Sequence, residues 1–224
     1  MAAPIALTTS TLFPNNRRCA MLNIFARASV AKFVDPVGSW LSRAGIGPDA
    51  ITLTGTLGTV ASALWFFPRD QLFAGTIAVT VFVLFDMLDG AVARARGQGT
   101  PLGAVLDAAC DRVADGALFA GLTWWCFEVA DDRPLAAAAL FCLVTAQVIS
   151  YIKARAEANG LSADGGMVER AERFIIALVG AGLTGLGVPF ALDIALWLLA
   201  GLQLVTVFQR MLAVRRSAQE REMR

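Results

Sequence analysis

The sequence contains no histidine, and its four cysteines form no CxxC pair. Without histidine, the chain has no histidine acid–base catalysis, no Ser–His–Asp triad and no ordinary zinc site. We expect the cysteines to be buried and inert, because three of them lie in apolar stretches. The net charge is only +1, so the composition does not favour nucleic-acid binding. Any chemistry therefore depends on carboxylates, arginines, lysines, hydroxyls or a hard metal ion.

The chain also has few polar residues for its length. Apolar residues make up 57% of the 224 residues, and the mean hydropathy is +0.62. They gather in long stretches separated by short polar breaks, and about 20 apolar residues in a helix cross a bilayer core. We therefore predict an all-α integral membrane protein with six transmembrane helices. The predicted spans are residues 50–68, 73–92, 102–127, 134–153, 171–188 and 190–210.

Two amino-terminal segments precede these spans. Residues 1–20 do not resemble a signal peptide, because Arg17 and Arg18 follow the apolar part instead of preceding it. We predict that they are a disordered segment or an extension upstream of Met21. Residues 21–46 combine apolar side chains at helical spacing with basic residues. This pattern predicts a juxtamembrane amphipathic helix, which lies either in the membrane interface or packed on the protein.

The basic residues predict the orientation. An even number of spans places both ends on one side, and 16 of the 19 basic residues then fall on that side. Only Arg69 and Arg133 fall in the opposite loops, and basic loops are cytoplasmic. We predict a multi-pass protein of the cell membrane, in contact with membrane lipids, with cytoplasmic termini. Residues 47–215 form the six-helix domain in this prediction, and residues 216–224 form a cytoplasmic tail.

Four aspartates lie near the predicted cytoplasmic ends of the second and third spans. Asp86 and Asp89 are three residues apart, and Asp107 and Asp111 are four apart, so each pair shares one helix face. The short connection makes the two helices antiparallel neighbours, and the carboxylates can converge. Four ionised carboxylates in this position would repel one another, unless some are protonated or paired with arginines. We predict that Mg²⁺, or alternatively Mn²⁺, neutralises them, with enough ligands for two ions.

The aspartates belong to a longer pattern. The sequence matches D-x2-D-G-x2-A-R-x8-G-x3-D-x3-D at every fixed position. The matching residues are Asp86, Asp89, Gly90, Ala93, Arg94, Gly103, Asp107 and Asp111. This pattern resembles that of the CDP-alcohol phosphatidyltransferases. The resemblance implies a six-helix membrane enzyme that transfers a phosphatidyl group from CDP-diacylglycerol to an alcohol, and it also implies a homodimer. For Gly103, helix packing and a ligand contact both remain open.

The resemblance also implies roles for individual residues. Asp86, Asp89 and Asp107 would ligate the metal ions, and Asp111 would be a further ligand and the general base. Thr52 could assist donor binding. The residues expected to bind the CDP-linked donor are Gly47, Pro48, Asp49, Ala50, Gly90, Arg94 and Thr100.

Basic residues also gather around the predicted loop between the fourth and fifth spans. Membrane topology alone explains such a cluster, and so does a pocket for a phosphorylated acceptor. The stretches FVLFDMLDGA, VISYIKARAEA and ADGGMVERAER resemble the bacterial phosphatidylinositol phosphate synthases within the family, although Ala171 replaces an expected proline. The resemblance implies inositol 1-phosphate as the acceptor, bound by Lys153, Arg155 and Arg173, with Ser150 nearby.

Two other functions remain open from the sequence. Glycerol 3-phosphate is an alternative acceptor, because it also carries a phosphate group. A cation transporter is a more distant alternative, because acidic residues in spans often mark ion paths. The position of the four aspartates near one membrane face favours the enzyme.

Overall fold

The computed structural model describes residue 45, residues 47–95 and residues 100–223. The predicted segment 1–20 and nearly all of the segment 21–46 lie outside the described residues. The remaining chain is helical, which confirms the predicted all-α class. The helices are α2 (Pro48–Phe66), the 3-10 helix η1 (Phe67–Arg69), α3 (Leu72–Asp86), α4 (Leu88–Ala95), α5 (Pro101–Glu128), α6 (Arg133–Ala158), α7 (Arg170–Gly185) and α8 (Ala191–Glu222).

Four described helical segments are long and apolar enough to cross a membrane. They are Pro48–Arg69, Leu72–Gly90, Arg133–Ala158 and Ala191–Glu222. The other two predicted spans correspond to α5 and α7. Helix α5 has 28 residues, but it carries four charged residues between positions 107 and 115, and α7 has only 16 residues. The chain is thus a helical membrane protein, whereas the count of six spans stays a prediction.

The six long helices form a closed ring of neighbours. Contacts join α2 to α3, α3 to α7, α7 to α8, α8 to α6, α6 to α5 and α5 back to α2. The buried core between them is apolar and rich in alanine, and it includes Phe67, Leu118 and Phe119. Cys110, Cys126 and Cys142 are buried, as predicted. Large apolar side chains such as Leu57, Trp124 and Phe208 are exposed on the outside, as expected of a surface that faces lipid.

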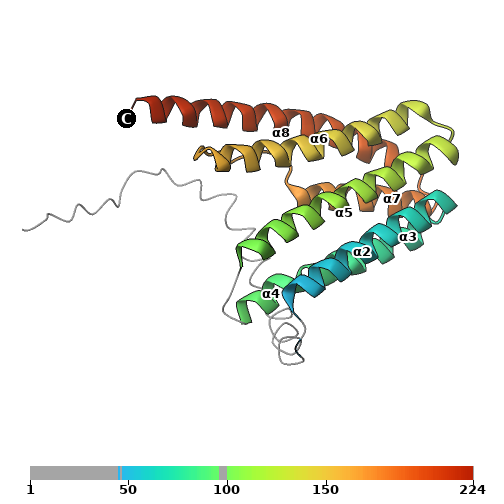
Figure 1. Ribbon diagram of the computed structural model, residues 1–224. Helices are drawn as coiled ribbons and strands as arrows, with labels where there is room; N and C mark the ends of the chain where they lie inside the picture. Colours follow the sequence, from blue (N-terminus) through green and yellow to red (C-terminus); the bar gives the residue numbers. More distant parts are fainter. Residues whose placement is uncertain (1–44, 46, 96–99, 224) are drawn as a thin grey trace, which may run out of the picture.

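Several helix ends meet at one end of this ring. Figure 1 shows α4, the beginnings of α2 and α5 and the end of α6 on the side toward which the C-terminal half of α8 extends. Helix α5 begins there because the Thr100 side chain caps it, accepting a hydrogen bond from the Gly103 N–H at 2.9 Å. The predicted span 73–92 is interrupted, since Met87 separates α3 from α4. Asp86 therefore ends α3, and Asp89 lies in the first turn of α4.

Candidate metal and substrate site

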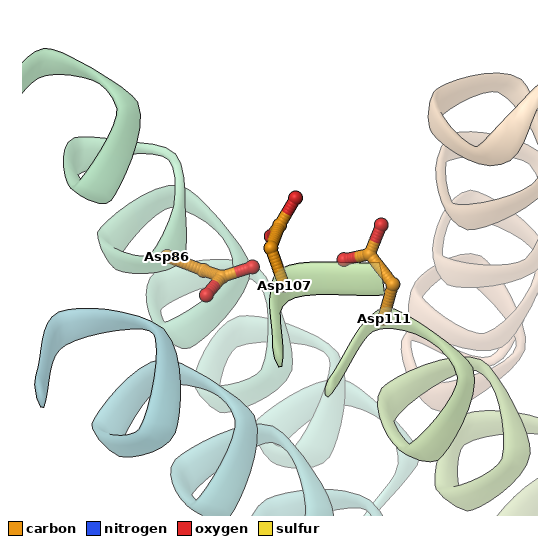
Figure 2. Close-up of side chains that lie close together, drawn as sticks. All are labelled: Asp86, Asp107 and Asp111. Atoms are coloured by element: carbon orange, nitrogen blue, oxygen red, sulfur yellow. The ribbon is translucent and has the colours of Figure 1, made fainter. Parts of the chain in front are cut away.

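Three carboxylates converge at this end of the bundle. Ligand oxygens of Asp86, Asp107 and Asp111 all lie within 4.8 Å of one another. Figure 2 shows Asp86 approaching from α3, with Asp107 and Asp111 one turn apart on α5. Asp86 is buried, Asp111 is half-buried and Asp107 is exposed, so the cluster is open on one side. We call these three residues the carboxylate cluster.

A glycine on α2 allows Asp86 to take its position. A Cβ at Gly55 would lie 2.8 Å from Asp86 Cβ and 3.0 Å from Asp86 Cα, closer than side chains pack. Any larger residue would therefore push α3 away from α2 at the point where α3 supplies its ligand. Gly55 was not predicted from the sequence, because it lies 31 positions before Asp86 and outside the family pattern.

Asp89 is oriented by α2 and by its own backbone. The Thr52 hydroxyl donates a hydrogen bond of 2.6 Å to Asp89 Oδ2, and the Gly90 N–H donates to Asp89 Oδ1. Asp89 does not belong to the group of three mutually close carboxylates. The structure therefore brings together three of the four predicted metal ligands and places Asp89 beside Thr52.

The donor groups of the cluster suit a hard divalent cation. All three ligands are carboxylates, which Mg²⁺ and Mn²⁺ prefer. Asp86 Oδ1 is buried and has no hydrogen-bond partner among the described residues. A buried carboxylate oxygen without a partner is costly, and a metal ion would satisfy it. The residues present therefore fit a divalent metal.

The residues predicted to bind the donor lie around the starts of α2, α4 and α5. Gly47 precedes α2, and the stretch 48–50 forms its first turn. A Cβ at Gly103 would lie 3.3 Å from Asp49 Oδ1 and 3.0 Å from Thr100 Oγ1, so the starts of α2 and α5 are close neighbours. Gly90 lies in the first turn of α4, and Arg94 lies further along α4, with its side chain outside the described part.

A cavity of about 800 Å³ adjoins the carboxylate cluster. Asp111 lines both, so the two features share a wall. Ser150 also lines the cavity, whereas Arg155 does not and is exposed on α6. The cavity lining carries a net positive charge, because it has five cations and three carboxylates: Arg112, Lys153, Arg170, Arg173 and Arg210 against Asp111, Glu157 and Glu169.

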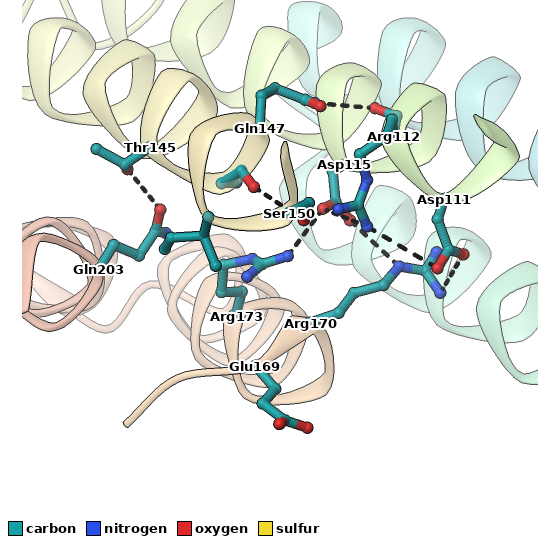
Figure 3. A network of polar contacts seen from close by, with 12 residues as sticks. Asp111, Arg112, Asp115, Thr145, Gln147, Ser150, Glu169, Arg170, Arg173 and Gln203 are labelled. Carbon is teal, nitrogen blue, oxygen red and sulfur yellow. Dashed lines mark hydrogen bonds and ion pairs between the residues drawn. The ribbon is translucent and has the colours of Figure 1, made fainter. Parts of the chain in front are cut away.

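A fully buried carboxylate on α5, Asp115, organises three of these cations (Figure 3). Its oxygens lie 3.0 Å from an Arg173 nitrogen, 3.2 Å from Arg170 Nε and 3.4 Å from an Arg112 nitrogen. This role of Asp115 was not predicted from the sequence. Its position four residues after Asp111, on the same helix face, was the available signal.

Arg210 is the third residue of the site that was not predicted from the sequence. It is buried on α8 and donates hydrogen bonds to the Ile149 carbonyl at 2.8 Å and to the Gly165 carbonyl at 3.2 Å. These bonds join α8 to α6 and to the segment before α7, and they fix one wall of the cavity. A single arginine near the end of the last apolar stretch was the only sequence signal.

The fold and the site define a helical membrane protein with a carboxylate centre for hard cations beside a cationic cavity. The sequence pattern of the CDP-alcohol phosphatidyltransferase family matches residues 46–212. The chain belongs to the CDP-alcohol phosphatidyltransferase family and is a transferase, as the aspartate pattern implied.

Three phosphatidylinositol phosphate synthases are similar to this chain over most of its length. The phosphatidylinositol phosphate synthase of Mycobacteroides abscessus is 56% identical over 198 residues, which cover 88% of this chain and 90% of the relative. That of Mycobacterium tuberculosis is 54% identical over 193 residues, with 85% and 89% covered. That of Corynebacterium glutamicum is 46% identical over 203 residues, with 90% and 93% covered.

Solved structures of the Mycobacterium tuberculosis phosphatidylinositol phosphate synthase have the same fold. The structure with CDP-DAG bound gives a TM-score of 0.79 at 55% identity, covering 82% of this chain and 94% of that chain. The complex with manganese and citrate gives a TM-score of 0.80 at 55% identity, covering 82% and 90%. A divalent metal in so similar a structure supports divalent metal use by this family member.

Proposed function

We propose that this protein is a phosphatidylinositol phosphate synthase, which transfers a phosphatidyl group from CDP-diacylglycerol to inositol 1-phosphate and releases CMP. The observation that carries the proposal is the cationic cavity that shares Asp111 with the carboxylate cluster. An acceptor phosphate held among the cavity cations would have its hydroxyl next to the metal-binding carboxylates. Identities of 54–56% to synthases of this activity support the same conclusion.

The carboxylate cluster would hold Mg²⁺ through Asp86, Asp107 and Asp111, with Asp89 as the fourth ligand. Four carboxylates provide enough oxygens for two ions, and Mn²⁺ would be accepted as well. Bound divalent ions neutralise the charge that develops on transferring phosphate groups. In the proposed site, Thr52 orients Asp89, because its hydroxyl donates a hydrogen bond to one of the two carboxylate oxygens.

The CDP-linked donor would bind at the starts of α2, α4 and α5. Backbone N–H groups at a helix start attract phosphate, and glycines allow a ligand close approach. The donor residues in this proposal remain Gly47, Pro48, Asp49, Ala50, Gly90, Arg94 and Thr100.

The reaction requires one proton transfer and one displacement. Lys153 and Arg173 would bind the acceptor phosphate, with Ser150 nearby, whereas Arg155, which the family resemblance also implies, lies outside the cavity lining. Asp111 would accept the proton of the attacking hydroxyl, since its carboxylate faces the cavity. The hydroxyl oxygen forms a bond to the lipid-side phosphorus as the bond from that phosphorus to CMP breaks. Positioning of the two substrates supplies a large share of the rate enhancement.

The wider setting follows from the family and the charge distribution. We propose that residues 47–215 form the catalytic domain in the cell membrane, with the site and both termini on the cytoplasmic side. We further propose that the protein forms a homodimer, as the family resemblance implies.

The acceptor is tested by measuring CMP release from purified protein with CDP-diacylglycerol, Mg²⁺ and one acceptor at a time. Inositol 1-phosphate should give turnover, and glycerol 3-phosphate should give little. Lys153→Gln removes a cation from the cavity wall, so the KM for the acceptor should rise about tenfold while the KM for the donor stays unchanged. Arg155→Gln is the matched comparison outside the cavity and should raise the acceptor KM less. Turnover with glycerol 3-phosphate alone would remove the proposed acceptor.

A further inference from the structure

Asp115 is a charged group that the proposed reaction does not use. It is fully buried within α5, where an ionised carboxylate is costly unless cations compensate it. Three arginines provide that compensation, and two of them come from α7, more than 50 positions away in the sequence. Both carboxylate oxygens are engaged: Oδ1 accepts from Arg170 and Oδ2 accepts from Arg173.

Arg170 connects Asp115 to the carboxylate cluster. Its Nε donates to Asp115 Oδ1 at 3.2 Å, while its Nη1 lies 2.7 Å from Asp111 Oδ1 and 4.0 Å from Asp86 Oδ2. The guanidinium also lies over the Phe174 ring, with Cζ 5.0 Å from the ring centroid. One planar cation therefore contacts a buried carboxylate at one edge and two members of the cluster at another.

We propose that Asp115 is a positioning residue that holds Arg170 in the cavity wall, so that Arg170 can release its contact with Asp111 when a divalent cation binds there. This inference rests on the metal-binding part of the proposed function and not on the identity of the acceptor. Arg170 and a metal ion compete for the same Asp111 oxygen. The Asp115 contact through Nε keeps the guanidinium in place when its Nη1 contact is lost.

The proposed role of Asp115 predicts the direction in which each substitution changes the affinity for the metal ion. Without the Asp115 carboxylate, Arg170 keeps two of its carboxylate contacts among the described residues, those with Asp111 and Asp86. Arg170 then binds the cluster more strongly and opposes the incoming cation. Without Arg170, the cluster loses a competing cation and binds the metal more tightly. A purely structural role would instead weaken metal binding in both variants.

The test measures Mn²⁺ binding to the full-length protein in detergent by electron paramagnetic resonance of free Mn²⁺. Asp115→Asn should raise the Kd for Mn²⁺ roughly tenfold, and Arg170→Gln should lower it by a similar factor. The double variant should match Arg170→Gln, because Asp115 acts through Arg170. Asp115→Glu keeps the charge and should lie between Asp115→Asn and the unaltered protein.

Three results with the variants overturn the inference alone. They are an unchanged Kd in Asp115→Asn, a weaker Kd in Arg170→Gln, and an Asp115→Asn effect that persists without Arg170. Asp115→Asn leaves Arg173 buried without its ion pair, so this variant could aggregate. In that case, Asp115→Asn is combined with Arg173→Met, and the double variant is compared with Arg173→Met alone. Absence of Mn²⁺ binding to the unaltered protein overturns the inference and the metal part of the proposed function together. Turnover with another acceptor overturns only the proposed acceptor.

Discussion

At the scale of single residues, Thr52 orients one of the proposed metal ligands, Asp89. The Thr52 side chain is buried on α2, and its hydroxyl holds Asp89 Oδ2 at 2.6 Å. Thr52→Val keeps the shape of the side chain and removes the donor. Removing such a partner of a metal ligand typically costs 10–100-fold in metal affinity. We expect Thr52→Val to raise the Mg²⁺ concentration for half-maximal CMP release about tenfold.

Thr54→Val is the matched control. Thr54 lies two residues further along α2, is exposed, and donates only to the Ala50 carbonyl of its own helix at 2.7 Å. The same substitution there should leave the Mg²⁺ requirement unchanged. Equal effects of the two variants would show that the hydroxyl of Thr52 acts on α2 itself and not on Asp89.

Local spacing explains which site residues could be predicted. Asp107 and Asp111 lie one turn apart on α5, so the sequence alone places their side chains on one face. The partners of Asp115 could not be found in this way. Arg173 is 58 positions away, and only the packing of α7 brings it to Asp115. The predicted phosphate ligands illustrate the same limit, since Lys153 lines the cavity and Arg155 does not.

At the scale of helices, the approach of α2 to α3 sets the position of Asp86. Gly55→Ala would place a methyl group 2.8 Å from Asp86 Cβ and 3.1 Å from Asp86 Oδ1. Overpacking of this kind costs about 1–3 kcal/mol, whereas alanine improves helix propensity by about 1 kcal/mol. We expect a lower melting temperature and a Kd for Mn²⁺ at least several-fold weaker, measured by thermal unfolding and Mn²⁺ titration.

Gly201→Ala provides the comparison on α8. A Cβ at this glycine has no heavy atom within 4 Å, so the substitution changes helix propensity without a clash. Its melting temperature should be equal to or higher than that of the unaltered protein. A Gly55→Ala protein with the same stability and Mn²⁺ affinity would show that α2 and α3 separate without disturbing Asp86.

The starts of the long helices were predictable to within a few residues, because apolar length and capping residues determine them, whereas α8 extends twelve residues beyond the predicted end at 210. Helix α6 was expected at 134–153 and extends over Arg133–Ala158. Its start is fixed by Asp132, which accepts a hydrogen bond from the Leu135 N–H at 2.8 Å. The break at Met87 could not be predicted, because no proline or glycine marks it. Because of this break, Asp86 and Asp89 lie on different helices. Their separation of three residues in the sequence therefore does not bring Asp89 into the carboxylate cluster.

At the scale of the whole molecule, the ring of helices places the site at one end. The carboxylate cluster, from the end of α3 and the first turns of α5, and the cationic cavity lie at that end. Figure 1 shows the C-terminal half of α8 extending on the same side as the beginning of α5. The opposite end carries a different set of contacts: Arg69 lies over the Trp65 ring, and Trp125 donates to Asp70 at 2.7 Å. Aromatic residues beside charged ones are typical of a membrane–water interface. One end of the bundle therefore carries the carboxylates and the cationic cavity, and the other carries aromatic residues beside charged ones. Such a difference is consistent with one fixed orientation in the membrane.

This orientation predicts which end impermeant reagents reach in intact cells. Ala130→Cys lies exposed between α5 and α6, and Gln219→Cys lies exposed near the end of α8. Both are made in a Cys19→Ser background, since the other native cysteines are buried. A membrane-impermeant maleimide should label the cysteine at 130 in intact cells and the cysteine at 219 only after permeabilisation. The reverse order would place the basic end outside, against the rule that basic loops remain in the cytoplasm. It would also place the proposed site on the outer side of the membrane, so the labelling order tests the orientation and the location of the proposed site together.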